Sequence, residues 1–337
     1  MIHRWMSLIL AAIGLITVWC TVALGAAEMA LDGEAAIDAG GRRLVMDTPY
    51  RRIISLYGAH SENLCALGAA DQVIGIAASE AAPPELQGKP RYSARDDLEK
   101  FLAASPDLVL IRPMIDRGYS QLVNQLEKHG VTVASLQPAT IDQMFVYWRI
   151  LGLLSGHRGQ AEEMIERFSR TVETIRMRTA VIANKKRVYF EAIHEHMRTF
   201  SPSAMPIFAL ETAGGINVAK DAAPRRGTNI ADFGKERILS RADEIDVYLA
   251  QVGPMNRPSI AQIKSEPGFG LIRAVREDRV YLIDEELVSR PSLRLIEGIC
   301  QIGRTLYPEI FLPEAEWLGC AVDKTEAGPT IHKEIHR

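Results

Sequence analysis

Histidine, tyrosine and arginine recur in this sequence shortly after apolar runs of the kind that form buried strands. A guanidinium group pairs well with carboxylate or phosphate, and imidazole is a common metal ligand at neutral pH. Because the loops that follow parallel strands meet at one edge of a sheet, we expect these residues to share one ligand site. The expected ligand-binding residues are Tyr57, His60, Tyr92, Arg95, Arg112, Arg117, Tyr119, His194, His196, Arg198, Arg225 and Arg290.

The arginines in this set favour an anionic ligand, although many surface arginines are simply solvated. His60, His194 and His196 are candidates for direct metal ligation, and a His-x-His pair at the end of a strand points both rings the same way. The alternative is that each histidine makes an ordinary polar contact. The sequence therefore predicts no firm metal site.

One segment of the sequence occurs twice, starting at Glu99 and at Glu236. In each copy an acidic residue opens a short amphipathic helix, and an acidic turn then leads to an apolar strand, over 108–111 and 247–249. Between the copies, residues 160–182 carry apolar side chains at helical spacing without proline or glycine. The pattern indicates two similar lobes joined by one long helix, with a ligand cleft between them. The alternative is a chance likeness of two helix–turn–strand units.

Strands alternate with helices along most of the chain, which is typical of an α/β fold with mainly parallel sheets. A β-hairpin is expected at the start, where residues 36–38 and 43–46 flank two glycines suited to a tight turn. We expect two Rossmann-like lobes around the long helix. The expected divisions are an export signal over 1–27, an N-terminal α/β lobe with its hairpin over 28–155, a backbone helix over 156–184, a C-terminal α/β lobe over 185–311 and a tail over 312–337.

The first 27 residues have the composition of an export signal: a basic start at Arg4, an apolar stretch over 8–24 and small residues over 25–27. An uncleaved membrane anchor is the alternative, because the apolar stretch approaches the ~20 residues that span a bilayer. Trp19 precedes Cys20, where lipid attachment needs a small residue, so we expect no lipid anchor. The sequence thus predicts a periplasmic protein.

Three cysteines remain after the signal. Cys300 and Cys320 are candidates for a disulfide that would tie down the tail, since exported proteins meet an oxidising compartment. Cys65 lies on an apolar helix face and is expected to be a buried thiol. None of the three has the spacing of a metal site.

Composition and motifs exclude several classes of function. The net charge of −3 leaves no excess of basic residues for phosphates, so we expect no nucleic-acid partner. The sequence lacks a Gly-x-Ser-x-Gly elbow, a His-Glu-x-x-His motif and a phosphate-binding Gly-Lys-Ser/Thr loop. We therefore expect neither an enzyme nor a bound cofactor. An exported chelatase-like enzyme, with the histidines as metal ligands, is the alternative from another class.

Five motifs appear in order along the chain: DAGGR, RIISL followed by Glu62 and ALG, SPDLV, ETAGGINVA and RPSLRLIEG, at residues 38–42, 52–68, 105–109, 211–219 and 290–298. In this pattern the chain resembles the helical-backbone (class III) solute-binding proteins of ABC importers for ferric siderophores, haem and cobalamin. The resemblance extends from Ile37 to about Phe311.

The resemblance implies partners and a ligand class. In this family one glutamate of each lobe docks to arginines of the membrane permease, and the matching residues are Glu99 and Glu236. The implied partners are an ABC permease and its ATPase, with the binding protein itself a monomer. A ferric siderophore is the favoured cargo, and cobalamin or haem is the alternative. Tyr92 has about the spacing of the iron-ligating tyrosine in haem-carrying members, but its neighbours differ from theirs.

Overall fold

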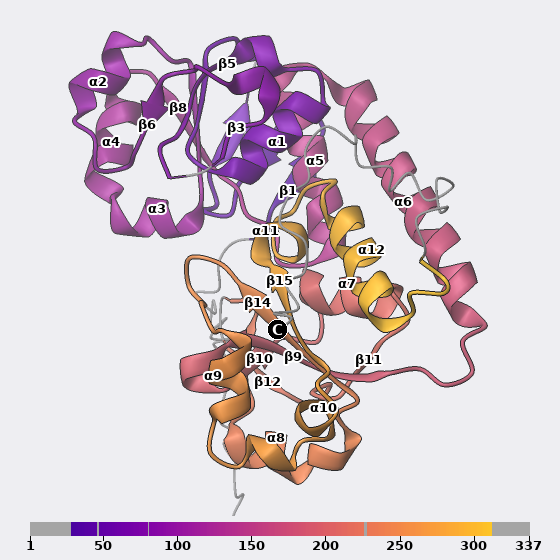
Figure 1. Ribbon diagram of the computed structural model, residues 1–337. Helices are drawn as coiled ribbons and strands as arrows, with labels where there is room; N and C mark the ends of the chain where they lie inside the picture. The colour runs from indigo at the N-terminus through magenta and orange to yellow at the C-terminus, as the bar shows by residue number, and fades with distance from the viewer. Residues whose placement is uncertain (1–27, 46, 80, 226–227, 312–337) are drawn as a thin grey trace, which may run out of the picture.

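The computed structural model describes residues 28–45, 47–79, 81–225 and 228–311 (Figure 1). The predicted export signal over 1–27, the tail over 312–337 and Cys320 lie outside the described residues. No helix in the described part of the chain is both long enough and apolar enough to cross a membrane.

A small antiparallel sheet opens the fold, in the order β1-β2-β3. Its strands are β1 (Ala30–Asp32), β2 (Ala35–Ile37) and β3 (Arg43–Val45). The predicted hairpin is therefore confirmed as β2 and β3. Its turn is held by Asp38, whose buried carboxylate accepts hydrogen bonds from the backbone N–H groups of Gly40 (2.8 Å), Arg42 (2.8 Å) and Ser135 (2.9 Å). The last of these bonds fixes the hairpin to the main N-terminal sheet.

The N-terminal half contains a parallel sheet in the order β6-β5-β4-β7-β8. Its strands are β4 (Ile53–Ser55), β5 (Val73–Ala77), β6 (Arg91–Tyr92), β7 (Leu108–Ile111) and β8 (Thr132–Ser135). Its helices are α1 (Gly58–Ala66), α2 (Leu98–Ala103), α3 (Pro113–Gly118) and α4 (Ser120–Lys128), with 3-10 turns η1 (Ala70–Gln72) and η2 (Pro84–Leu86). This is the predicted alternation of strand and helix.

The C-terminal half contains a mixed sheet in the order β12-β13-β10-β9-β14-β15, with β11 also paired to β9. The strands are β9 (Arg187–Ile193), β10 (Arg198–Phe200), β11 (Ile216–Asn217), β12 (Ala223–Pro224), β13 (Ile230–Asp232), β14 (Val247–Val252) and β15 (Val280–Asp284). β9, β14 and β15 are parallel, but β10, β12 and β13 pair antiparallel. β10 reverses direction because only a short turn separates it from β9, which is too little chain for a parallel crossover.

The helices of this half are short except the last. They are α7 (Met205–Thr212), α8 (Lys235–Ser240), α9 (Ile260–Ser265), α10 (Arg273–Arg276), α11 (Glu285–Val288) and α12 (Leu295–Leu306), with 3-10 turns η3 (His194–His196), η4 (Ala242–Glu244) and η5 (Phe269–Leu271).

Two helices, α5 (Ile141–Ser155) and α6 (Arg158–Ala180), connect the halves. The predicted long helix is confirmed: α6 has 23 residues, about 35 Å at the usual rise, and runs along one side of both halves (Figure 1). Gly156, at φ +79°, ends α5 in the left-handed conformation that glycine tolerates. At Gly152 a Cβ atom would lie 2.7 Å from that of Ala161, so glycine permits the two helices to pack closely.

One hydrophobic core extends through both halves. It joins Leu110 of β7 to Trp148 of α5, Phe168 of α6, Phe190 of β9 and Ile299 of α12, all buried. Smaller clusters occupy the other face of each sheet. The two halves are therefore packed against shared helices, and a single linker is not their only connection.

The predicted repeat is visible in the structure. Glu99 and Glu236 are each the second residue of a six-residue helix, α2 and α8. The acidic turn that follows has the same role in both copies. Asp107 accepts hydrogen bonds from the backbone of Arg51 (2.7 Å) and Arg52 (2.9 Å) before β4, and Asp246 accepts one from Arg187 (2.9 Å) at the start of β9.

The cysteines agree only in part with the prediction. Cys65 is a free thiol but only half-buried, and this burial raises its pKa to about 12. Cys300 lies buried in α12. Its predicted pairing with Cys320 involves a residue outside the described part of the chain.

Candidate ligand-binding site

His60 belongs to the core. Its Nδ1 lies 2.7 Å from the Tyr147 hydroxyl, and its Nε2 lies 3.2 Å from the carbonyl oxygen of Ile111. A carbonyl can only accept, so Nε2 donates to it and Nδ1 accepts from Tyr147. Burial lowers the pKa of His60 to about 3, and the ring stays neutral. Both nitrogens are engaged, so the structure does not support His60 as a metal ligand.

Arg112 follows β7 and lies over Tyr57, which follows β4. The guanidinium carbon is 4.4 Å from the Tyr57 ring centroid, a cation–π arrangement that fixes the plane of the guanidinium. The Arg112 side chain is half-buried and makes no hydrogen bond to the described residues, and its Nε is buried without a partner. Tyr57 is buried. Of the predicted N-terminal site residues, Arg112 is thus the one held in place with donor capacity left over.

Tyr92 is placed differently from the prediction. Its ring packs in the core beside Phe101, with ring centroids 5.1 Å apart, and only 5% of the residue is exposed. A Cβ at Gly75 would lie 2.4 Å from the ring, so β5 carries glycine where the tyrosine crosses it. This packing gives the Tyr92 ring a structural role and argues against a metal-ligating one.

Three other predicted residues of the N-terminal half are at the surface. Arg95 Nε donates to the Tyr119 hydroxyl at 3.2 Å. Arg117, at the end of α3, is exposed and makes no hydrogen bond or ion pair to the described residues.

His194, directly after β9, is oriented by a buried carboxylate. Its Nδ1 lies 2.9 Å from Glu191 Oε2, and Glu191, which is fully buried, also accepts a short hydrogen bond from the Tyr248 hydroxyl. The bond to Glu191 raises the pKa of His194, against the opposing effect of burial. When Nδ1 carries the proton, Nε2 is left as an acceptor. This arrangement is the one in which a carboxylate orients a metal-ligating histidine.

His196 does not join His194. Residues His194–His196 form the 3-10 turn η3, in which successive residues are ~120° apart, so the two rings do not point the same way as they would on a strand. His196 is exposed. Within the described residues, no group of three or more His, Cys, Asp or Glu side chains is arranged to hold a metal ion.

The predicted arginines of the C-terminal half are paired with acids. Arg198 Nε and Arg225 Nη1 lie 3.1 Å and 3.0 Å from the Asp232 carboxylate. Both positions are therefore partly neutralised, and the prediction that they bind an anion loses support.

Arg290 connects the two halves. Its Nη1 lies 2.7 Å from Glu62 of α1, and its Nη2 binds Glu286 of α11. The hydroxyl of Ser292 donates to the other Glu62 oxygen at 2.7 Å. Next to this pair, Asn63 donates to the carbonyl oxygen of Pro291 at 2.8 Å. Arg290 thus serves as an interlobe contact, whereas the sequence predicted a ligand contact.

Glu285 is a candidate that sequence reasoning missed. It follows β15 and is half-buried, and its side chain makes no hydrogen bond to the described residues. Burial raises its pKa, while the nearby charges of Arg290 and Arg112 act in the opposite direction. Arg112 and Glu285 thus come from opposite halves and lie close enough for the charge of Arg112 to act on Glu285, and both side chains have unused hydrogen-bonding capacity. The rule that found Arg112, a polar residue just after a strand, would have found Glu285 had acids been included.

Glu99 and Glu236 are exposed, and neither carboxylate forms an ion pair with a described residue. Both are thus available to an external partner.

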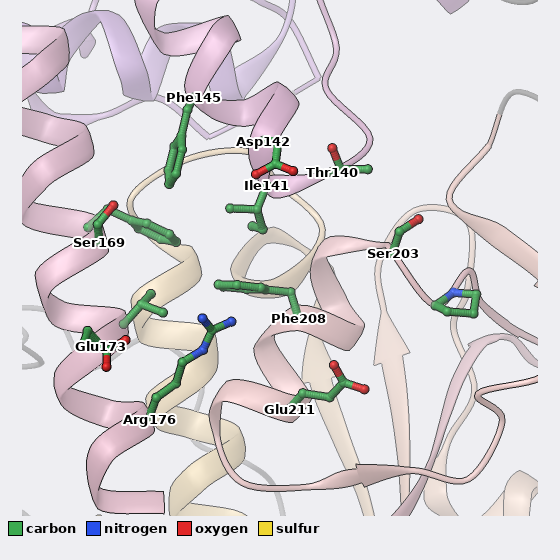
Figure 2. A pocket seen from close by; sticks show the side chains of 13 residues that line it. Thr140, Ile141, Asp142, Phe145, Ser169, Glu173, Arg176, Ser203, Phe208 and Glu211 are labelled. Carbon is green, nitrogen blue, oxygen red and sulfur yellow. The ribbon is translucent and has the colours of Figure 1, made fainter. Parts of the chain in front are cut away.

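A cavity of about 550 Å³ lies elsewhere, between α5, α6, α7 and the loop after β10 (Figure 2). None of the predicted site residues lines it.

The periplasmic binding protein family matches residues 53–287. The chain is 23% identical over 280 residues to an uncharacterised ABC transporter substrate-binding lipoprotein of Bacillus subtilis, covering 81% of this chain and 85% of the relative. It is 21% identical over 283 residues to a cobalamin-binding protein of Halobacterium salinarum, covering 80% of this chain and 73% of that one.

Solved structures show the same fold. A possible iron-binding periplasmic solute-binding protein of Staphylococcus epidermidis has a TM-score of 0.68 at 25% identity, over 77% of this chain and all of that one. The periplasmic haem-binding protein HutB of Vibrio cholerae has a TM-score of 0.65 at 20% identity, over 76% and 99%. The chelatase-like alternative is wrong, since members of the family are transport proteins and not enzymes. The chain therefore belongs to the periplasmic binding protein family and is the substrate-binding component of an ABC transporter.

Proposed function

We propose that the protein captures a metal chelate between its two halves in the periplasm and delivers it to the permease of an ABC importer. The observation that carries the proposal is the pair Arg112 and Glu285, which come from opposite halves within electrostatic reach of each other. Both side chains are half-buried, and neither side chain is hydrogen-bonded to the described residues. A ligand that contacts both would be held by both halves at once.

Arg112 favours a cargo with anionic or strongly accepting oxygens. A buried donor without a partner costs about 1–3 kcal/mol, and a ligand oxygen at Nε would remove that cost. The Tyr57 ring beneath the guanidinium holds it in one plane, which suits a two-pronged contact with a carboxylate. A ferric siderophore is the cargo we favour. Haem, with its carboxylates, and cobalamin are the alternatives, and the names of relatives and structural neighbours include both.

His194 supports a metal-centred cargo. The buried Glu191 holds its Nδ1, so a neutral His194 would offer Nε2 to a metal with an open coordination position. A siderophore fills the coordination sphere of its iron, whereas haem leaves axial positions open. Dependence of the metal spectrum on His194 would therefore favour haem or cobalamin over the siderophore.

The test is to purify the protein from its native envelope and record its absorption spectrum and metal content. A broad charge-transfer band with iron supports a ferric siderophore, a Soret band supports haem, and a corrin spectrum with cobalt supports cobalamin. The Arg112→Gln protein, prepared in parallel, should carry less of the same chelate. A protein that carries no chelate and binds none of the three on titration would contradict the proposal.

Delivery is proposed to use Glu99 and Glu236. Their equivalent positions on α2 and α8, and the absence of ion pairs between them and the described residues, support two matching contacts, one on each half, with arginines of the permease. We further propose that the N-terminal signal directs export of the protein and that the protein acts as a monomer.

A further inference from the structure

The cavity of about 550 Å³ is formed by elements of both halves. It is lined by side chains of α5, α6 and α7 and by Pro202 and Ser203 of the loop after β10 (Figure 2). Its volume is within the range of cavities that bind small organic molecules.

The cavity is separate from the region proposed for the cargo. Phe145 of α5 lines it, whereas Tyr147, two residues on, bonds to His60 behind Tyr57. Residues two apart in an α-helix are ~200° apart around its axis. The two regions therefore lie on opposite sides of α5, and an occupant of the cavity need not be the transported chelate.

Its walls are aromatic. Phe168 and Phe208 have ring centroids 6.3 Å apart with planes at 21°, and Phe145 meets Phe168 edge-on at 5.9 Å. Phe145 and Phe208 are only partly buried, and Figure 2 shows the two rings on either side of the open space. These rings provide a surface for a flat or alkyl group.

Its charges are mainly negative. Asp142, Glu173 and Glu211 line it together with a single cation, Arg176. None of the three carboxylates is hydrogen-bonded or ion-paired to a described residue. The Arg176 guanidinium lies over the Phe208 ring, 5.0 Å from its centroid, and Figure 2 shows the Glu211 carboxylate directed away from it. Partial desolvation raises the pKa of Glu211, and Arg176 offsets only part of this effect.

We propose that this cavity is a second binding site and takes an organic ammonium ion that carries an aromatic or alkyl group. The apolar group would lie between Phe145 and Phe208, and the ammonium would pair with Glu211. Three carboxylates against one guanidinium make the cavity selective for cations, and the aromatic faces add cation–π attraction.

The test uses three probes with one body and different charges: 2-phenylethylammonium, 2-phenylethanol and phenylacetate. We expect the ammonium to bind the full-length protein with Kd on the order of 1 mM, typical of so small a ligand, and at least fivefold tighter than the alcohol. Saturation-transfer NMR and calorimetry measure the affinities. Equal affinity for ammonium and alcohol, tighter binding of phenylacetate, or no binding up to about 20 mM would each overturn the proposal.

Variants locate the effect. Glu211→Gln should reduce the affinity for the ammonium to that for the alcohol, while Glu166→Gln, which removes a charge from the exposed face of α6 outside the cavity, should not. Ser203→Trp, at the cavity wall, should weaken binding of all three probes. Thermal melting confirms that each variant is folded. Unchanged ammonium binding by Glu211→Gln, or equal losses in Glu211→Gln and Glu166→Gln, would contradict the assignment. None of these measurements depends on which chelate is transported.

Discussion

Arg290 and Glu62 join the two halves of the protein by an ion pair of 2.7 Å, with only 10% and 14% of their side chains exposed. Glu286 binds the other side of the guanidinium, and Ser292 binds the other oxygen of Glu62. A pair so little exposed is hardly screened by solvent, and both of its members are satisfied by further hydrogen bonds.

Arg290→Gln should therefore lower the free energy of unfolding by about 2 kcal/mol, because it leaves the carboxylates of Glu62 and Glu286 with only the more exposed Arg294 as a cationic partner. The matched control is Arg198→Gln. It breaks a pair whose Asp232 is 54% exposed, and should change stability by less than about 0.5 kcal/mol. Urea denaturation measures the free energy of unfolding of both variants. Similar decreases in the two would show that the interlobe ion pair stabilises the fold no more than an exposed pair does.

The halves should move little relative to each other when cargo binds. The shared core, the Arg290–Glu62 pair and the absence of proline within α6 all oppose bending. We expect the radius of gyration from X-ray scattering to change by less than about 1 Å between the free and loaded protein. A contraction of several ångströms would contradict this expectation.

His194 and Glu191 should make stability depend on pH. The Glu191 carboxylate raises the pKa of His194, so its charged form is stabilised in the folded protein. This stabilisation is complete below the unfolded pKa of ~6.5 and is lost as the pH rises through the folded pKa. In Glu191→Gln the histidine pKa, followed by NMR, should fall. An unchanged pKa in that variant would remove Glu191 as the cause.

His60 should give folding stability a pH dependence opposite to that of His194. Burial lowers its pKa to about 3, so the folded protein excludes a proton that the unfolded chain takes up. Its contribution to stability is present above the unfolded pKa of ~6.5 and is lost as the pH falls towards 3. Denaturation at several pH values below 6 should show this loss, and its absence would show that the ring is more accessible than the structure indicates.

Cargo affinity should depend on Arg112 more than on Tyr92 or Arg198. Arg112→Gln is expected to weaken binding at least tenfold, about 1.4 kcal/mol, since it removes the unpaired donor. Tyr92→Phe should bind as the parent does, because the ring is packed in the core and its hydroxyl makes no described hydrogen bond. Titration of each variant with the chelate identified in the native protein measures these affinities and tests the expected order.

Glu99 and Glu236 should affect transport without affecting cargo binding. Changing both to Arg is expected to keep the cargo Kd within about threefold, because both side chains are exposed and neither is ion-paired with a described residue. Uptake should fall sharply through repulsion from permease arginines. Uptake by a reconstituted transporter, measured beside cargo titration, tests both parts. Normal uptake by the double variant would make these residues ordinary acids of the first helical turn.

Local pattern was enough to predict the hairpin, the repeat and the long helix. These features depend on spacing along the chain: glycines at a turn, an acid at each helix start, and apolar residues at helical intervals over 160–182. Three of the five ordered motifs, around residues 52–68, 105–109 and 211–219, fall within or at the edge of the region 53–287 that matches the family.

The roles of individual site residues were decided only by the tertiary structure. His60 lies in α1 after β4, Tyr92 ends β6, and Arg290 comes after β15 and α11. The first two pack in the core, and the third pairs with an acid 228 positions away. Whether a side chain faces a ligand or a neighbour depends on what lies across the interface, and one sequence does not specify that. For the same reason Glu285 and the cavity lined by Phe145 and Phe208 became visible only once distant helices were brought together.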